Sequence, residues 1–156
     1  MTEPSPARIV ADADVLAADL LVGGDARAAL DHVRRHDWLT LVASEPLLDE
    51  AEAVIGSLAE TRLATAWRDR VETDCELVDH PAGDHPGLAS AYRGEAAHLL
   101  TYDDSLRSAR TGLSIQPHAD LSVRPPDAFA RLFDPEALYE ATHDGDYPGP
   151  DRDPRD

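Results

Sequence analysis

Four acidic residues in this chain come at or just after the end of a short apolar run. Asp12 and Asp103 follow their runs directly, whereas Glu50 and Asp84 come several residues later. The runs cover residues 8–11, 39–44, 75–78 and 98–102. If each run is a strand of a parallel sheet, the four carboxylates gather at one edge of that sheet, where such folds bind ligands. Carboxylates placed together repel one another unless a cation is present, so this pattern predicts a site for hard divalent metals and metal-assisted phosphoryl chemistry.

Each of these four acidic residues has a predicted role in binding the metal. We predict Asp12 and Asp103 as direct metal ligands, with Glu50 and Asp84 completing the site directly or through water. One or two bound cations would lower the pKa of a bound water and neutralise charge on a phosphodiester. Thr101 and Ser44 are expected to hold carboxylates in place by hydrogen bonds. Three arginines are candidates for phosphate contacts, although a surface ion pair is the favoured interpretation for each in so acidic a chain: Arg93, Arg107 and Arg110.

The elements that must position these residues alternate between strand and helix. Four strands are predicted at 8–12, 39–43, 75–79 and 99–102, and a weaker fifth lies within 113–123. Helices are predicted at 14–22, 25–36, 44–58, 58–72, 86–95, 104–110 and from 125 onward. Alternation of this kind implies an α/β fold with a mostly parallel sheet covered by helices on both faces.

The length of 156 residues fits one domain. We predict a leader at 1–7, a single domain at 8–140 and an acidic disordered tail at 141–156, because Asp, Gly and Pro dominate that end. Cys75 is the only cysteine, lies in an apolar run, and is expected in the core of a reduced cytoplasmic protein. No apolar stretch is long enough for a membrane span, and the N-terminus lacks the pattern of a signal peptide, so no membrane partner is expected.

The charge balance is extreme. The chain carries 31 acidic residues against 14 basic ones, a net charge of −17, and every basic residue is Arg. This composition is typical of proteins from archaea that hold molar salt in the cytoplasm, where screening over about 3 Å relieves self-repulsion. An acidic mesophilic protein is the alternative. In molar salt the counterion contribution to binding nucleic acid is small, so the negative charge does not exclude a polyanionic substrate.

The ordered motifs resemble those of the PIN-domain nucleases. The segment 10–16 is similar to the family's first strand with its terminal Asp, and 44–50 resembles its second motif, a Ser followed by a helix carrying a Glu. The segment 84–91 resembles the Asp that precedes an L-x-x-A helix, and 99–106 resembles the motif V-T-x-D-x-x-L. The likeness spans residues 8–133, although Tyr102 replaces the usual Gly before Asp103.

The resemblance implies a three-layer α/β/α sandwich with four to five strands and Mg²⁺- or Mn²⁺-dependent hydrolysis of single-stranded RNA. It therefore implies a hydrolase, an endoribonuclease with RNA as substrate. A catalytically inactive binding or scaffold protein of the same fold is an alternative. A small-molecule phosphohydrolase is a further one, disfavoured because the chain has no Gly-rich phosphate loop. An antitoxin-like protein and a second copy of this chain stay open as partners.

Overall fold

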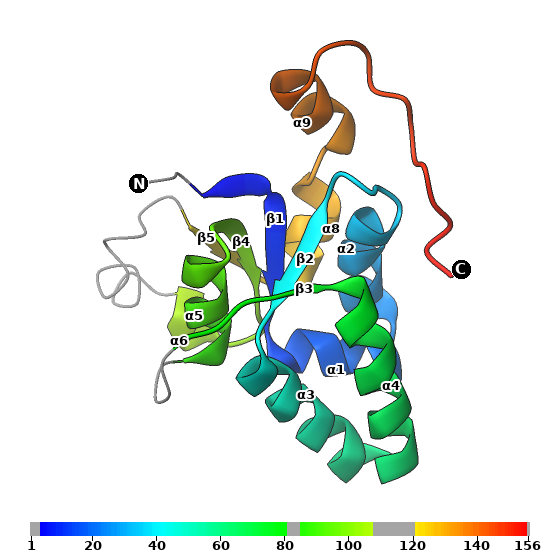
Figure 1. Ribbon diagram of the computed structural model, residues 1–156, viewed down its shortest axis with the longest axis vertical. Helices are drawn as coiled ribbons and strands as arrows, with labels where there is room; N and C mark the ends of the chain where they lie inside the picture. Colours follow the sequence, from blue (N-terminus) through cyan, green and yellow to red (C-terminus); the bar gives the residue numbers. More distant parts are fainter. Residues whose placement is uncertain (1–3, 81–84, 108–120, 156) are drawn as a thin grey trace.

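The computed structural model of this chain describes residues 4–80, 85–107 and 121–155. It is an α/β fold with a parallel sheet between layers of helices (Figure 1). The strands are β1 (Ser5–Ala11), β2 (Thr40–Ala43), β3 (Glu76–Leu77), β4 (Ala96–Leu100) and β5 (Ser122–Arg124). The helices are α1 (Ala13–Leu21), α2 (Gly24–Arg34), α3 (Glu45–Leu58), α4 (Thr61–Asp74), α5 (Pro86–Arg93), α6 (Asp104–Arg107), α8 (Pro126–Leu132) and α9 (Pro135–Thr142).

The five strands lie in the order β3-β2-β1-β4-β5, and all four neighbouring pairs are parallel. The chain moves outward from β1 through β2 to β3, then returns to place β4 on the other side of β1. The direction of winding therefore reverses between β1 and β4. In open α/β sheets this reversal leaves a crevice at the carboxyl ends of the two strands, which is the usual place for a ligand.

Side chains at one register point to the same face of a parallel sheet, which fixes the layers. Val10 and Val42 are in register, and a Cβ atom at Gly94 would lie 2.4 Å from Val42 Cγ1, so α5 covers their face. His98 is in register with the residue before Val10 and therefore faces the other side. There its ring packs edge-on against Phe129 of α8, and α8 packs beside α2. The predicted three-layer sandwich is confirmed.

The start of the sheet differs from the prediction. Residues 1–7 were expected to form a leader, but β1 begins at Ser5, whose amide donates to Glu95 O at 2.7 Å. The ladder is irregular between Ser5 and Ile9. Pro6 has no amide hydrogen to donate, and this irregular stretch accommodates it.

The third and fourth strands also differ from their predicted bounds. β3 has two residues instead of five, because it pairs only with β2 at the edge of the sheet. Cys75 ends α4 instead of lying in that strand; it packs against the core, and burial raises its thiol pKa to about 11. β4 begins at Ala96, after Glu95 turns the chain with a φ of 54°, and it ends at Leu100. Thr101 therefore lies just beyond β4 instead of inside it.

The C-terminal segment, residues 143–155, packs against the domain although we expected residues 141–156 to form a disordered tail. α9 extends to Thr142, and the chain then runs back past α2 (Figure 1). Tyr147 Oη lies 2.5 Å from Nε2 of the buried His36, and the amides of Asp151 and Arg152 donate to Arg35 O. A composition rich in Asp, Gly and Pro indicates a lack of regular structure. It does not exclude ordered contacts through backbone and side-chain polar groups.

Candidate functional site

Asp12 lies at the point where the sheet reverses direction. It ends β1 and begins α1 as the N-cap, accepting a hydrogen bond from the Ala13 amide at 3.0 Å through Oδ1. Its other oxygen accepts a hydrogen bond from Thr101 Oγ1 at 2.9 Å. The side chain is almost fully buried, with 7% of the residue exposed. The carboxyl ends of β1 and β4 are thus joined through Asp12 and Thr101.

Thr101 also positions the loop that carries Asp103. Its hydroxyl oxygen accepts a hydrogen bond from the Asp103 amide at 3.1 Å while its proton is donated to Asp12. The Asp103 carboxylate is exposed and accepts two hydrogen bonds, from Ser105 Oγ at 2.7 Å and the Ser105 amide at 2.9 Å. These bonds stabilise the charged form and lower the pKa of Asp103. The hydrogen bond that we predicted from Thr101 to a carboxylate is present.

Asp14 is part of the same site, although we predicted it mainly as a cap or turn residue and did not count it among the four ligands. It lies in the first turn of α1, where Oδ2 accepts a hydrogen bond from the Tyr102 amide at 3.1 Å. Its other oxygen, Oδ1, is buried and has no hydrogen-bond partner. Burial raises the pKa of Asp14, and the charge of Asp12 and, more weakly, that of Asp103 add to the shift. The signal that could have identified Asp14 is its spacing of two residues from Asp12.

We call Asp12, Asp14 and Asp103 the carboxylate cluster, and His85 lies beside it. His85 caps α5, with Nδ1 accepting from the Gly87 and Leu88 amides at 3.1 and 3.4 Å. Because Nδ1 is an acceptor there, the neutral ring carries its proton on Nε2, which lies 3.9 Å from Asp12 Oδ2. A Cβ at Gly87 would lie 3.0 Å from Asp12 Oδ1, so glycine allows this close approach.

Two of the four predicted ligands are not placed with this cluster. Glu50 lies exposed on α3 and makes no hydrogen bond or ion pair with the residues that the structure describes. Asp84 lies outside the described residues. Neither observation excludes a contact with a cation or a bound water, so both stay predictions. The first turn of α1 contributes the third carboxylate that the structure does place in the cluster.

Ser44 contacts no carboxylate within the described part of the chain, and because Asp84 lies outside it, the role predicted for Ser44 stays a prediction. Its Oγ caps α3 by accepting from the Leu47 amide at 3.3 Å and also accepts from Ser90 Oγ at 2.8 Å. His80 Nε2 lies 3.0 Å from the same oxygen. Ser44 and Ser90 are fully buried, so this group joins the start of α3 to the middle of α5.

The arginines proposed for phosphate contacts are only partly described. Arg93 lies in the last turn of α5 with its side chain exposed. Arg107 ends α6, and Arg110 lies outside the described residues. Apart from His85, the described side chains bring no cationic group within ion-pair distance of the carboxylate cluster. The phosphate contacts suggested for these arginines therefore stay predictions.

The cluster offers only oxygen atoms as metal ligands, which suit a hard cation such as Mg²⁺ or Mn²⁺. The buried Asp14 Oδ1, which has no hydrogen-bond partner, is one such ligand atom. Within residues 4–80, 85–107 and 121–155, however, no three His, Cys, Asp or Glu side chains form a ready coordination sphere. The cluster therefore suits a metal in the type of its ligand atoms and in its location. A full set of ligands would also need Asp84, Glu50 or water.

Comparison with known proteins adds a family but no activity. No curated protein and no solved structure matches the chain. No helix in the described part of the chain is both long and apolar enough to cross a bilayer. Residues 3–155 match the family of unknown function DUF7384, and the chain belongs to that family.

Proposed function

We propose that the protein is a metal-dependent endoribonuclease that hydrolyses phosphodiester bonds of single-stranded RNA at the carboxylate cluster. The observation that carries this proposal is the meeting of Asp12, Asp14 and Asp103 where β1 and β4 end. A ligand is expected at that crevice from the topology alone. The resemblance of the ordered motifs to those of PIN-domain nucleases is the basis for proposing RNA as the substrate and Mg²⁺ or Mn²⁺ as the metal.

The electrostatics of the cluster support a cation there. Asp14 has one buried oxygen without a partner, and its raised pKa reflects burial and the neighbouring charge of Asp12. Uncompensated buried carboxylates destabilise a fold, so such a group in a crevice is a candidate functional site. A divalent cation bound between these oxygens would neutralise their charge, activate a water and stabilise charge on the scissile phosphate.

The protein's own residues have distinct proposed roles. Asp12 and Asp103 hold the cation, and Asp14 is the third carboxylate. Thr101 is a positioning residue, because its hydroxyl fixes both the Asp12 carboxylate and the Asp103 amide. His85 directs its Nε2 proton into the same crevice, where it is placed to donate a hydrogen bond to a phosphate oxygen.

The test is cleavage of a labelled single-stranded RNA in molar KCl with Mn²⁺ or Mg²⁺. We expect EDTA-sensitive cleavage by the wild type and a loss of at least a hundredfold in Asp12→Asn and in Asp103→Asn. Asp69→Asn is the matched control, because Asp69 is an exposed aspartate of α4 outside the cluster. Equal activity in all four proteins, or cleavage that survives EDTA, would show that the cluster is not the active site.

A non-catalytic binding or scaffold protein of the same fold is the second candidate. One observation favours it: the described residues include no ready set of three metal ligands, and hydrogen bonds already engage Asp12 and Asp103. Under this proposal Mn²⁺ still raises the melting temperature through Asp12, but RNA is bound or ignored without being cut. Binding of RNA without cleavage, across lengths and divalent ions, would favour the scaffold.

A further inference from the structure

A second cavity lies away from the carboxylate cluster, between α1, α2, α4 and the C-terminal segment. Its volume is about 530 Å³, within the usual range for small-molecule sites. None of Asp12, Asp14 and Asp103 lines it. Its walls include the apolar side chains of Leu41, Val71 and Trp67, and the Trp67 ring is only partly buried. The cavity therefore combines an apolar wall with a flat ring available for stacking.

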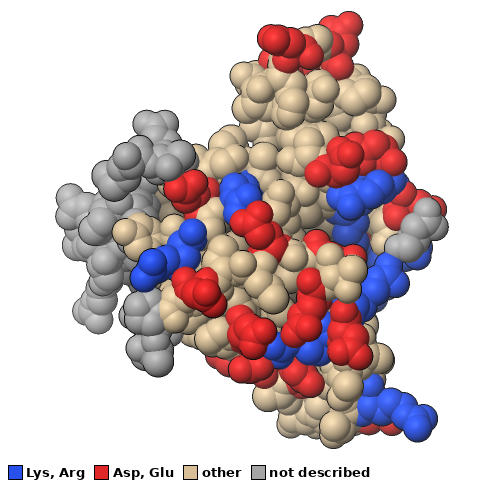
Figure 2. Space-filling model, in the orientation of Figure 1, with Lys and Arg blue, Asp and Glu red and all other residues tan. Residues whose placement is uncertain are grey.

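Five of the chain's 14 arginines surround this cavity, which we call the arginine pocket: Arg27, Arg34, Arg70, Arg152 and Arg155. Four aspartates also line it, so its lining carries one excess positive charge in a protein of net charge −17. Figure 2 shows acidic side chains spread over this face of the molecule, with basic side chains among them. Asp31, which pairs with Arg34 and Arg155, offsets this excess positive charge, so the pocket is close to neutral and far less acidic than the protein as a whole.

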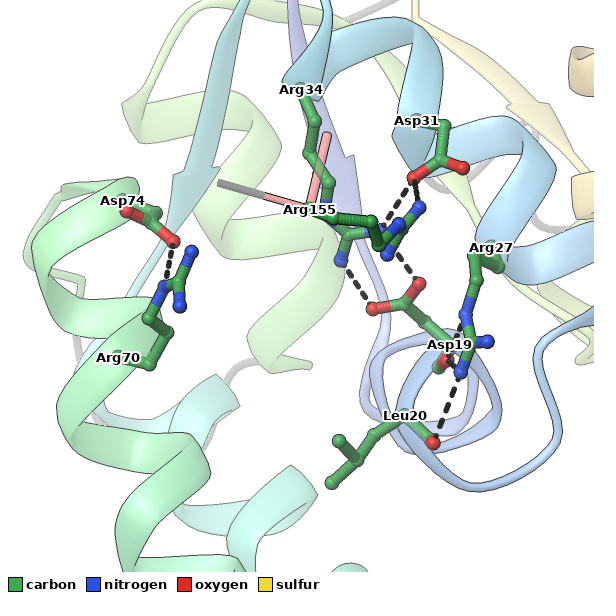
Figure 3. Close-up of polar contacts among 8 residues, drawn as sticks. All are labelled: Asp19, Leu20, Arg27, Asp31, Arg34, Arg70, Asp74 and Arg155. Carbon is green, nitrogen blue, oxygen red and sulfur yellow. Dashed lines mark hydrogen bonds and ion pairs between the residues drawn. The ribbon is translucent and has the colours of Figure 1, made fainter. Parts of the chain in front are cut away.

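Arg34 and Arg155 are held by aspartates, and Arg155 keeps N–H donors for a ligand. Arg34 forms a fork with Asp19, with Nη1 2.8 Å from Oδ1, and its Nη1 also donates to Asp31 at 3.1 Å (Figure 3). Arg155 reaches the same Asp31 from the C-terminal segment through Nη2 alone. Its Nε and Nη1 make no hydrogen bond to the described residues. Groups fixed before binding lose less entropy when a ligand arrives.

Arg70 lies across the pocket on α4, where its Nε donates to Asp74 at 3.3 Å (Figure 3). Its side chain is 63% exposed, so a ligand in the pocket can reach the guanidinium without displacing a buried pair. Arginine also presents paired N–H donors that match the oxygens of a phosphate or carboxylate. Trp67 lies one turn before Arg70 on the same helix, so an anionic group at Arg70 places an attached ring beside Trp67.

We infer that the arginine pocket binds a small organic anion, in which a phosphate or carboxylate group is attached to a flat apolar ring. The anion contacts Arg70 and Arg155, and the ring lies against Trp67. Because Arg155 belongs to the C-terminal segment, this segment forms part of the binding site. The inference is independent of the endoribonuclease proposal, since no residue of the carboxylate cluster takes part.

Fluorescence and thermal melting test this inference. The chain has two tryptophans, so Trp38→Phe leaves Trp67 as the sole reporter at the pocket. Titrations would use adenosine monophosphate and indole acetate, with adenosine and inorganic phosphate as probes that each lack one half. EDTA keeps divalent ions off the carboxylate cluster. We expect at least one of the ring-bearing anions to quench Trp67 and raise the melting temperature, and either half alone to bind at least tenfold more weakly.

Two arginines of α4 provide matched variants. Arg70→Gln is expected to weaken binding about tenfold, whereas Arg62→Gln, on the same helix but outside the pocket, is expected to leave it unchanged. Binding of adenosine monophosphate alone would assign the pocket to phosphate esters, and binding of indole acetate alone to carboxylates. The inference is wrong if neither anion binds, or if the two arginine variants bind equally well.

Discussion

Asp12 and Asp19 lie on the same strand-helix segment and are both almost fully buried, at 7% and 6% exposed, but their surroundings are opposite. Asp19 is paired with the guanidinium of Arg34, which Asp31 also contacts. Asp12 is accompanied by the like charges of Asp14 and Asp103, and the only described cationic partner is His85. The chain therefore neutralises one buried aspartate with arginine, whereas within the described residues no arginine lies at the other.

This contrast has a physical basis. A buried charge is tolerated when an opposite charge and hydrogen bonds compensate it, as at Asp19. Where compensation is missing, the fold loses stability, and the usual reason to retain such residues is binding or catalysis. The contrast thus separates a pair that holds helices together from the cluster that we propose as a cation site. The following predictions test that separation, from the largest expected effect to the smallest.

Breaking the Arg34 pair should give the largest loss of stability. Asp19→Asn leaves Arg34 partly buried with Asp31 as its one remaining carboxylate, and we expect the free energy of unfolding to fall by about 3 kcal/mol. Urea denaturation at fixed salt measures this. Asp69→Asn, which changes an exposed aspartate, serves as the control and should change stability by less than about 0.5 kcal/mol. A similarly small change in Asp19→Asn would mean that solvent already screens the pair.

The carboxylate cluster should respond to cations in the opposite sense. Mn²⁺ at a hundredfold excess over its Kd should stabilise the wild type by about 2.7 kcal/mol, because only the folded state brings the ligands together. Asp12→Asn should lose this gain and Asp19→Asn should keep it. Thermal melting with added KCl of equal ionic strength is the control. If Mn²⁺ stabilises no more than KCl does, the cluster is not a metal site.

Removing the C-terminal segment should destabilise the side of the molecule that contains the arginine pocket. A chain ending at Thr142 loses Tyr147 and the contacts of Asp151 and Arg152 with α2, and we expect a loss of about 2 kcal/mol. Tyr147→Phe keeps the ring and removes only the hydroxyl that lies beside buried His36, so about 1 kcal/mol is expected. An unchanged melting temperature in the truncated chain would restore the disordered tail of the sequence prediction.

Relieving repulsion in the cluster should give a small gain. Because the folded state raises the pKa of Asp14, this group stabilises the fold at low pH and loses that contribution as pH rises through the folded pKa. Asp14→Asn should therefore stabilise the metal-free protein at neutral pH, by up to about 1 kcal/mol after allowance for screening at a half-exposed group. The gain should shrink at low pH. A destabilised variant at neutral pH would show that the charged form of Asp14 is needed structurally.

The same pH series must be corrected for His98. Burial, followed by the charge of Arg124, lowers the pKa of His98 to about 4, so its contribution is lost as pH falls below the ordinary value of about 6.5. This effect has the opposite sign to that of Asp14. Comparing Asp14→Asn with wild type at each pH cancels it, because both proteins contain His98.

Several parts of the fold could be predicted because they depend on local patterns. Apolar runs identified β1, β2 and β4, and Ser44 followed by Pro46 correctly marked the start of α3. The two-residue strand β3 was overestimated, because an apolar run of that length does not reveal that only one neighbour is available for pairing. The C-terminal segment was predicted to be disordered because its composition does not reveal its contacts. Those contacts are made with residues just after α2, more than a hundred residues earlier in the chain.

For the candidate site, the sequence alone identified Asp12, Asp103 and the hydrogen bond from Thr101, because the end of a strand in a parallel sheet has a known place. Only the tertiary structure brought in Asp14 and His85, whose roles depend on how α1 and α5 meet the end of β4. It also placed Ser44 in contact with Ser90 and His80. The order of the helices and strands is encoded in the local periodicity of apolar residues. The partner of a polar side chain depends on packing between distant segments, and local sequence patterns carry no information on that packing.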